Sequence, residues 1–162
     1  IITDTGNFRY ENTNAKTFAI ATNLVAAGVK PHIISTRIYD NRSIANIRIC
    51  ALALSAIKFS NNAQIAWTCV TREMIERAGA KNEDMIGIVD HLRSIKDVKV
   101  AIFFREDNNK IKINFRSKDD TNVSAIAKAL GGGGHHRAAG VVLECSMDEA
   151  EKRVIAEVQR HL

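Results

Sequence analysis

The strongest constraint on the fold is a pair of neighbouring segments, residues 98–105 and 110–116, in which apolar side chains recur at every second position. A period of two is typical of β-strands, because successive side chains point to opposite faces of a sheet. The sequence Glu-Asp-Asn-Asn at residues 106–109 is typical of a turn, so we predict a hairpin. In its second strand the predicted core face holds Ile111, Ile113 and Phe115, and the opposite face holds Lys112, Asn114 and Arg116.

Further strands and helices are predicted around this hairpin. Strands are expected at residues 64–70 and 141–144, and helices at residues 71–78, 82–95, 122–130 and 147–162. The last helix is expected to begin at a capping box, Ser146-Met147-Asp148-Glu149. The predicted fold class is therefore α/β (α+β), a small mixed β-sheet domain with flanking helices.

The residues that precede this domain are predicted to be mostly helical. Thr13 or Asn14 is a candidate N-cap for a first helix, which Gly28 closes. Pro31 suits the first turn of a second, short helix that continues to about Tyr39.

A third helix is predicted from Ser43 to about Phe59. It is apolar over much of its circumference, so we expect it to pack on more than one side. Its expected inward stripe consists of Ile44, Ile47, Ala51 and Leu54. The polar pair Asn61-Asn62 is the best candidate for a boundary, which divides the chain into residues 1–60 and residues 61–162.

Composition narrows the classes of function. The net charge of +5 and the pI of about 9.3 mildly favour an anionic partner, such as a nucleotide or a nucleic acid. Cys50, Cys69 and Cys145 are far apart and odd in number, which predicts neither a disulfide framework nor a zinc site. This cysteine usage fits a reducing cytoplasm. No apolar run approaches the length of a membrane span, so we expect a cytoplasmic protein without a membrane partner.

Residues 130–140, Leu-Gly-Gly-Gly-Gly-His-His-Arg-Ala-Ala-Gly, carry the clearest chemical pattern. Consecutive glycines allow backbone conformations that a Cβ forbids, and they let the backbone approach a ligand closely. Their amides are expected to face an anion, to which His135 or Arg137 would add charge-assisted hydrogen bonds. The alternative is a flexible hinge between a helix and a strand. The His-His-Arg sequence and the small residues after it favour the first interpretation, because a linker needs neither.

A second charged position lies at the end of the hairpin, where Ser117 follows Arg116. The helix predicted at residues 122–130 returns the chain to the glycines, so we expect the strand end and the glycine loop to lie side by side. The predicted clamp for a phosphate or carboxylate consists of Arg116, Ser117, the amides of Gly132, Gly133 and Gly134, and His135. An arginine suits this role because its planar fork binds such groups bidentately. The alternative, more frequent for this spacing, is that the polar face of the strand is merely solvated.

The chain begins without a methionine, at Ile1-Ile2-Thr3-Asp4-Thr5-Gly6. This pattern is typical of the last residues of a strand followed by a site loop, so we expect the chain to be a fragment whose earlier part is absent. An aspartate at the carboxyl end of a strand is a candidate ligand for Mg²⁺ or Mn²⁺. The alternative is that Asp4 only caps the turn.

Three motifs together resemble those of the RecJ-like DHH phosphoesterases. Residues 132–140 resemble the GGGHxxAAG sequence of the DHH-associated domain, and Arg116-Ser117 is similar to the RS pair that precedes it in that family. Residues 3–9 resemble the fourth motif of the DHH catalytic domain, whose aspartate is a metal ligand. The resemblance covers nearly the whole chain. It is closest to the branch that degrades very short RNAs and removes the 3′-phosphate from 3′-phosphoadenosine 5′-phosphate.

The resemblance implies the C-terminal portion of such an enzyme. Residues 1–60 would be the end of the DHH catalytic domain, a mostly helical remnant with Asp4 as a metal ligand, and residues 61–162 would be the substrate-binding domain. The complete enzyme would hold two Mn²⁺ (or Mg²⁺) ions. The residues implied to bind substrate phosphate are Arg116, Ser117, Gly132, Gly133, Gly134 and His135.

The same resemblance implies an exonuclease or oligoribonuclease whose partner is short single-stranded RNA or DNA, or a phosphorylated nucleotide; we leave a homodimer open as its assembly. This chain has no Asp-His-His triplet, so no catalytic set is complete in it, and we expect the fragment alone to bind better than it catalyses. The alternative function is a non-catalytic nucleotide- or nucleic-acid-binding module. Relatives often have glutamate where this chain has Ile86.

Overall fold

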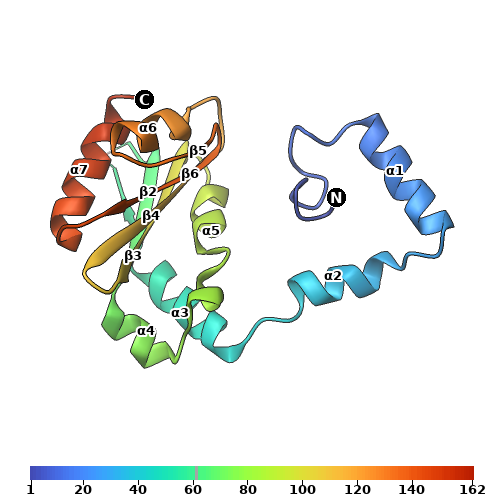
Figure 1. Cartoon of the computed structure of the whole chain (residues 1–162), viewed down its shortest axis with the longest axis horizontal. Helices are drawn as coiled ribbons and strands as arrows, with labels where there is room; N and C mark the ends of the chain where they lie inside the picture. The colour runs from blue at the N-terminus through green and yellow to red at the C-terminus, as the bar shows by residue number, and fades with distance from the viewer. Residues whose placement is uncertain (61) are drawn as a thin grey trace. The chain divides into compact units, whose positions relative to one another are not determined.

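The computed structural model describes residues 1–60 and 62–162. They divide into two compact units, unit 1 (Ile1–Arg42) and unit 2 (Ser43–Leu162), which Figure 1 shows. The boundary predicted at Asn61-Asn62 includes Asn61, which lies outside the described residues. The compact units separate one helix earlier, so the third helix belongs to the same unit as the sheet. The assignment of residues 1–60 and 61–162 to two functional domains stays a prediction.

Among the described residues, unit 1 contains α1 (Ala15–Ala26) and α2 (Pro31–Tyr39). The strands of unit 2 are β1 (Lys58–Phe59), β2 (Ile65–Val70), β3 (Val100–Asp107), β4 (Lys110–Ser117), β5 (Gly133–His135) and β6 (Ala138–Leu143). Its helices are α3 (Ile44–Ser55), α4 (Arg72–Ala78), the 3₁₀ helix η1 (Asn82–Met85), α5 (Ile88–Ser94), α6 (Val123–Ala129) and α7 (Met147–Gln159).

The strands form one mixed sheet in the order β1-β2-β3-β4-β6-β5. β2 and β3 pair in parallel, and all other neighbouring strands pair antiparallel. The predicted hairpin is β3–β4, in which Ile102 lies opposite Phe115. This mixed sheet with flanking helices confirms the predicted fold class.

Helices cover both faces of the sheet, but only one face is covered across its width (Figure 1). On the first face, α6 and α7 pack over a core that includes Phe104 and Phe115. On the second face, α3 and α5 pack over β2 and β3, α5 also contacts β4, and α4 packs against α3, with Ala101 and Phe103 in the core. On β4, β6 and β5 the residues of this second face are half-buried or exposed. These three strands therefore present an open strip of sheet, and the predicted site lies on it.

The buried face of α3 differs from the predicted stripe. Its buried residues are Asn46, Ile49, Cys50 and Ala53, whereas Ile44 and Ile47 are 72% and 54% exposed. The side chains of Ser43 and Asn46 both donate hydrogen bonds to Asp84, which fixes the rotation of the helix about its axis. Because the helix is apolar over much of its circumference, the spacing of its apolar residues did not decide which face is buried.

Three further predictions change. α3 ends at Ser55 and is followed by the short strand β1. The helix predicted at residues 82–95 is divided into η1 and α5 by Gly87, whose φ of +91° is left-handed. Ile1-Ile2 lies outside any strand, and the described residues of unit 1 include no strand that could pair with it. Ile86 is 75% exposed, and nothing in the structure explains an isoleucine at this exposed position.

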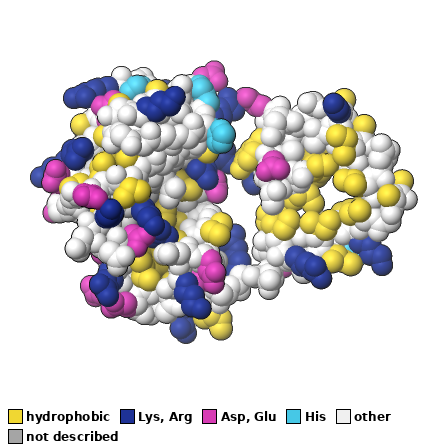
Figure 2. All heavy atoms as spheres, in the orientation of Figure 1, with side chains coloured by type: hydrophobic (Ala, Val, Ile, Leu, Met, Phe, Trp, Pro, Cys, Tyr) yellow, Lys and Arg dark blue, Asp and Glu magenta, His cyan; other side chains and the backbone are white. Residues whose placement is uncertain are grey.

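Unit 1 exposes much of its apolar surface. Neither α1 nor α2 contains a buried residue. A hollow of about 750 Å³ lies among apolar side chains of this unit, which Figure 2 shows gathered around it. No single helix in the described ranges is long and apolar enough to cross a membrane. The pair α1 and α2 reaches that length and composition together, with a bend of 110° between its members.

Candidate functional site

The central feature of the open strip is a row of paired residues, one on each of β4, β6 and β5. Arg116 lies opposite Ala138, and Ala138 lies opposite His135. Paired residues project from the same face of a sheet, so Arg116 and His135 flank the short side chain of Ala138. Their backbones are about 10 Å apart, because each strand lies about 4.8 Å from the next. The fold thus brings two predicted site residues to opposite sides of a gap.

Arg116 is held beside this gap by two groups. Its Nη1 donates a hydrogen bond to the carbonyl oxygen of Phe115 at 3.1 Å. Its Nε lies 3.8 Å from Oδ1 of Asp90 on α5, and the arginine side chain remains 33% exposed. An ion pair of this length in partly exposed surroundings is weak. The guanidinium of Arg116 therefore retains N–H groups that can donate hydrogen bonds to the oxygen atoms of a ligand.

The glycine run forms a strand rather than the predicted loop or a hinge. Residues 133–135 pair with β6, and the chain turns at His136-Arg137. A Cβ on Gly132 would lie 2.2 Å from the carbonyl oxygen of Gly140, and one on Gly134 would lie 2.5 Å from the backbone of β6. Real side chains do not approach so closely, so the contact between this run and β6 requires glycine.

Some backbone groups of the run are engaged within the fold. The amide of Gly132 donates to the carbonyl oxygen of Ala127 at 2.7 Å, so this amide is not directed at a ligand. The carbonyl oxygen of Gly134 accepts from Oγ of Ser124 at 2.8 Å. A Cβ on Gly133 would meet nothing within 4 Å. The binding roles of the three glycines stay predictions.

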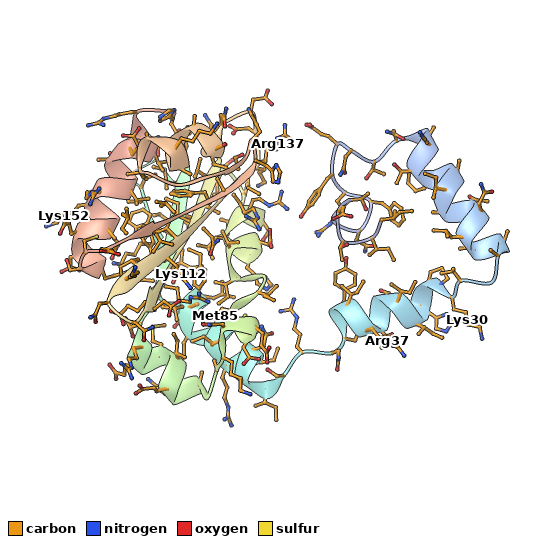
Figure 3. All side chains as sticks on the ribbon, in the orientation of Figure 1. Lys30, Arg37, Met85, Lys112, Arg137 and Lys152 are labelled. Carbon is orange, nitrogen blue, oxygen red and sulfur yellow. The ribbon has the colours of Figure 1, made fainter. Side chains whose placement is uncertain are left out.

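Ser117 is not brought into the row. It follows Arg116 on β4, so its side chain belongs to the opposite face of the sheet. Its Oγ is buried and has no hydrogen-bond partner among the described residues. Its amide donates to the carbonyl oxygen of Arg137 at 3.2 Å. Arg137 lies at the β5–β6 turn (Figure 3), with its Nη2 3.1 Å from Oδ1 of Asp120. A contact between Ser117 and phosphate stays a prediction.

Next to the row, the open strip contains a hollow of about 460 Å³. Its lining includes Arg105, Lys112, Asn114, Gly132, Gly140 and Val142. Lys112 and Asn114 belong to the predicted polar face, but Arg105 was not singled out, because its place opposite Lys112 depends on the β3–β4 register. A hydrogen bond from Lys112 holds the pKa of Asp107 below its usual range, so this carboxyl is charged at neutral pH.

Asp4 lies in the turns that precede α1, where it is exposed. Its backbone carbonyl oxygen accepts from Nδ2 of Asn12 at 3.0 Å. Residues 1–60 and 62–162 contain no group of three or more His, Cys, Asp or Glu side chains that could hold a metal ion. These residues by themselves therefore do not fit a two-metal centre, and Asp4 as a metal ligand stays a prediction.

Comparison with known proteins identifies the family of this chain. Residues 62–161 match the DHHA1 domain. The chain therefore belongs to the DHHA1 domain family of the DHH phosphoesterases, as its glycine and Arg-Ser motifs indicated.

The relatives carry more specific names. A bifunctional oligoribonuclease and PAP phosphatase NrnA from Thermus thermophilus is 33% identical over 165 residues, which cover 100% of this chain and 48% of the relative. The protein of the same name from Bacillus subtilis is 26% identical, over 98% of this chain and 49% of its own length. A crystal structure of an exopolyphosphatase-related protein from Bacteroides fragilis superposes with a TM-score of 0.93 at 29% identity, over 98% of this chain and 47% of that one. The chain thus spans about half the length of these relatives.

Proposed function

We propose that this chain supplies the phosphate-binding part of a metal-dependent phosphoesterase that hydrolyses short oligonucleotides, 3′-phosphoadenosine 5′-phosphate, or both. The observation that carries the proposal is the row in which Arg116 and His135 flank Ala138. A guanidinium and an imidazole on opposite sides of a gap suit separate oxygen atoms of one phosphate. The names of the relatives support the reaction class.

In this proposal the residues of the row bind and orient the substrate. Phosphoryl transfer depends chiefly on positioning and on neutralising charge at the phosphate, and a clamp that fixes two oxygen atoms supplies positioning. The proposed cofactor is Mn²⁺ or Mg²⁺ with Asp4 as one ligand, and the described residues add no further ligand cluster to it. The net charge of +5 supports an anionic partner, for which we propose short single-stranded RNA or DNA in the cytoplasm.

Replacing Arg116 by alanine tests the row directly. Loss of a charged hydrogen bond to phosphate costs about 1.5–3 kcal/mol, so binding of a 5′-phosphorylated ribodinucleotide is expected to weaken by about ten- to a hundredfold. Affinity is measured by calorimetry in the presence of a chelator, so that the ligand stays intact. Lys152→Ala on α7 removes the same charge from the other face of the sheet and serves as the control. An unchanged affinity in Arg116→Ala would mean that the polar face is merely solvated.

A hydrolysis assay tests whether these residues bind without completing a metal centre. Residues 1–162 are expected to bind the phosphorylated dinucleotide through Arg116 and to show no turnover in Mn²⁺ or Mg²⁺, because the described residues hold no cluster of metal ligands. Clear turnover would contradict this expectation. An Asp-His-His triplet encoded ahead of Ile1 would support the enzyme, and its absence would favour the nucleotide-binding module.

A further inference from the structure

We infer that the hollow beside the row is a second subsite, which takes the next nucleotide of a short oligonucleotide and, at its far rim, a further phosphate. The inference rests on the proposed function, because it takes Arg116 as the place of the first phosphate. It assigns ligand residues that the sequence motifs do not include, namely Arg105, Lys112 and Asn114. The subsite would also distinguish an oligonucleotide from a single nucleotide.

The floor of the hollow is largely backbone. Asn114, Gly140 and Gly133 form the paired row next to Arg116-Ala138-His135, and the two glycines leave that row without side chains on β6 and β5. A Cβ on Gly140 would come within 3.5 Å of Nδ2 of Asn114, so the asparagine amide lies over the glycine. The volume of about 460 Å³ falls in the range of small-molecule pockets and exceeds what a phosphate alone needs. A nucleoside fits this space, and the asparagine amide offers a donor and an acceptor to it.

Two cations lie on the side of the hollow away from the row. Arg105 and Lys112 are register partners on β3 and β4, and both line the hollow. One carboxylate, Asp107, lies near both of them: its Oδ2 is 3.7 Å from Nη2 of Arg105, and it accepts a hydrogen bond from Lys112. Two positive groups beside one negative group leave an excess positive charge at this rim, which favours an anion.

Arg105 is not fully satisfied by hydrogen bonds within the fold. Its side chain is only 14% exposed. Its Nε is buried and has no hydrogen-bond partner among residues 1–60 and 62–162. Buried donors are nearly always satisfied in folded proteins, because an unmet one costs free energy. The fold therefore leaves the guanidinium of Arg105, a residue that lines the hollow, incompletely hydrogen-bonded.

The spacing along β4 sets the length of the ligand. Lys112 and Arg116 are four residues apart on one strand, which corresponds to about 13 Å. The two phosphates of 3′-phosphoadenosine 5′-phosphate sit on a single ribose, so this molecule would occupy the row alone. A 5′-phosphorylated trinucleotide carries its phosphates at successive steps along a chain and would extend from the row to the rim.

The test compares two ligands across matched variants of the protein. Affinities for a 5′-phosphorylated ribotrinucleotide and for 3′-phosphoadenosine 5′-phosphate are measured in the presence of a chelator. Lys112→Ala is expected to weaken binding of the trinucleotide about tenfold. Its affinity for the mononucleotide, 3′-phosphoadenosine 5′-phosphate, is expected to stay within about twofold of the unsubstituted protein. Lys152→Ala is the control for loss of one charge, because Lys152 extends from α7 on the opposite side of the domain (Figure 3).

Asp107→Asn is expected to change the affinity for the trinucleotide in the opposite direction. Removing this carboxylate frees both cations of the rim for the ligand, so the trinucleotide is expected to bind several-fold more tightly while the mononucleotide is unchanged. A gain in affinity cannot come from misfolding, so this variant guards against the trivial explanation of a loss.

The outcomes separate the two proposals. If Lys112→Ala changes both ligands equally, or neither, and Asp107→Asn does not tighten the trinucleotide, the second subsite is wrong. If Arg116→Ala still weakens both ligands in that case, the proposed function stands without the subsite. If Arg116→Ala leaves both ligands unchanged, the proposed function itself fails, and the subsite fails with it.

Discussion

At the scale of single residues, Gly132 and Gly133 are neighbours with opposite packing demands. A Cβ on Gly132 would overlap the carbonyl oxygen of Gly140, whereas one on Gly133 would enter open space. Overpacking of this kind costs about 1–3 kcal/mol, so Gly132→Ala is expected to lower the free energy of unfolding by that amount. Gly133→Ala is expected to change it by less than about 0.5 kcal/mol. Urea unfolding of both variants checks the contrast, and equal losses would contradict the packing described for the glycine run.

At the scale of elements, one carboxylate joins the β1–β2 edge of the sheet to α7. Glu151 accepts from Nζ of Lys58 at 2.8 Å and from Nε1 of Trp67 at 2.6 Å. Burial by itself would raise the pKa of Glu151, but the hydrogen bonds from Lys58 and Trp67 outweigh it and lower the pKa overall. The folded state therefore favours the charged form of Glu151. The stabilisation that its contacts with Lys58 and Trp67 provide consequently depends on pH.

Glu151→Gln tests this joint because it keeps the shape of the side chain and removes its charge. At pH 7 the substitution is expected to lower the free energy of unfolding by about 1–2 kcal/mol, as hydrogen bonds to a charged group are lost. A lowered folded-state pKa means that the stabilisation is complete above the unfolded value of about 4.3. It disappears as the pH falls through the lower, folded value. The difference between the urea midpoints of the two proteins is therefore expected to be largest at pH 7 and to shrink as the pH falls below about 4.3. A difference that does not shrink in acid would contradict the assignment.

At the scale of the whole molecule, both buried cores lie within unit 2. Their members run from Ile49 to Val158, and no helix of unit 1 has a buried residue. A segment with its own core is expected to fold by itself. We predict that residues 43–162 unfold at the same urea midpoint as residues 1–162. Trp67, the single tryptophan of the sequence, reports this transition by fluorescence, and a lower midpoint in the shorter chain would show that unit 1 stabilises unit 2.

Periodicity predicted the elements that bury one well-marked face, namely β2, the β3–β4 hairpin, α6 and α7. It failed for α3, whose apolar circumference leaves the buried face undetermined, and for β5, because glycines carry no side-chain pattern. At the candidate site, the motifs singled out Arg116 and His135, which the structure brings into one row, and their contact with phosphate stays a prediction. The place of Arg105 depends on strand register, which local sequence does not fix. The predicted strand ended at Arg116, whereas β4 continues through Ser117, and the alternation of a strand then places Ser117 on the opposite face from Arg116.

The two borders of the sheet are its shortest strands, β1 with 2 residues and β5 with 3. A long exposed border offers unpaired backbone groups to a strand from another molecule, which is how edge-to-edge aggregation begins. Here each border ends before such a template can form. The strand that carries His135, a residue proposed to bind phosphate, is thus also one that offers little backbone to edge-to-edge pairing.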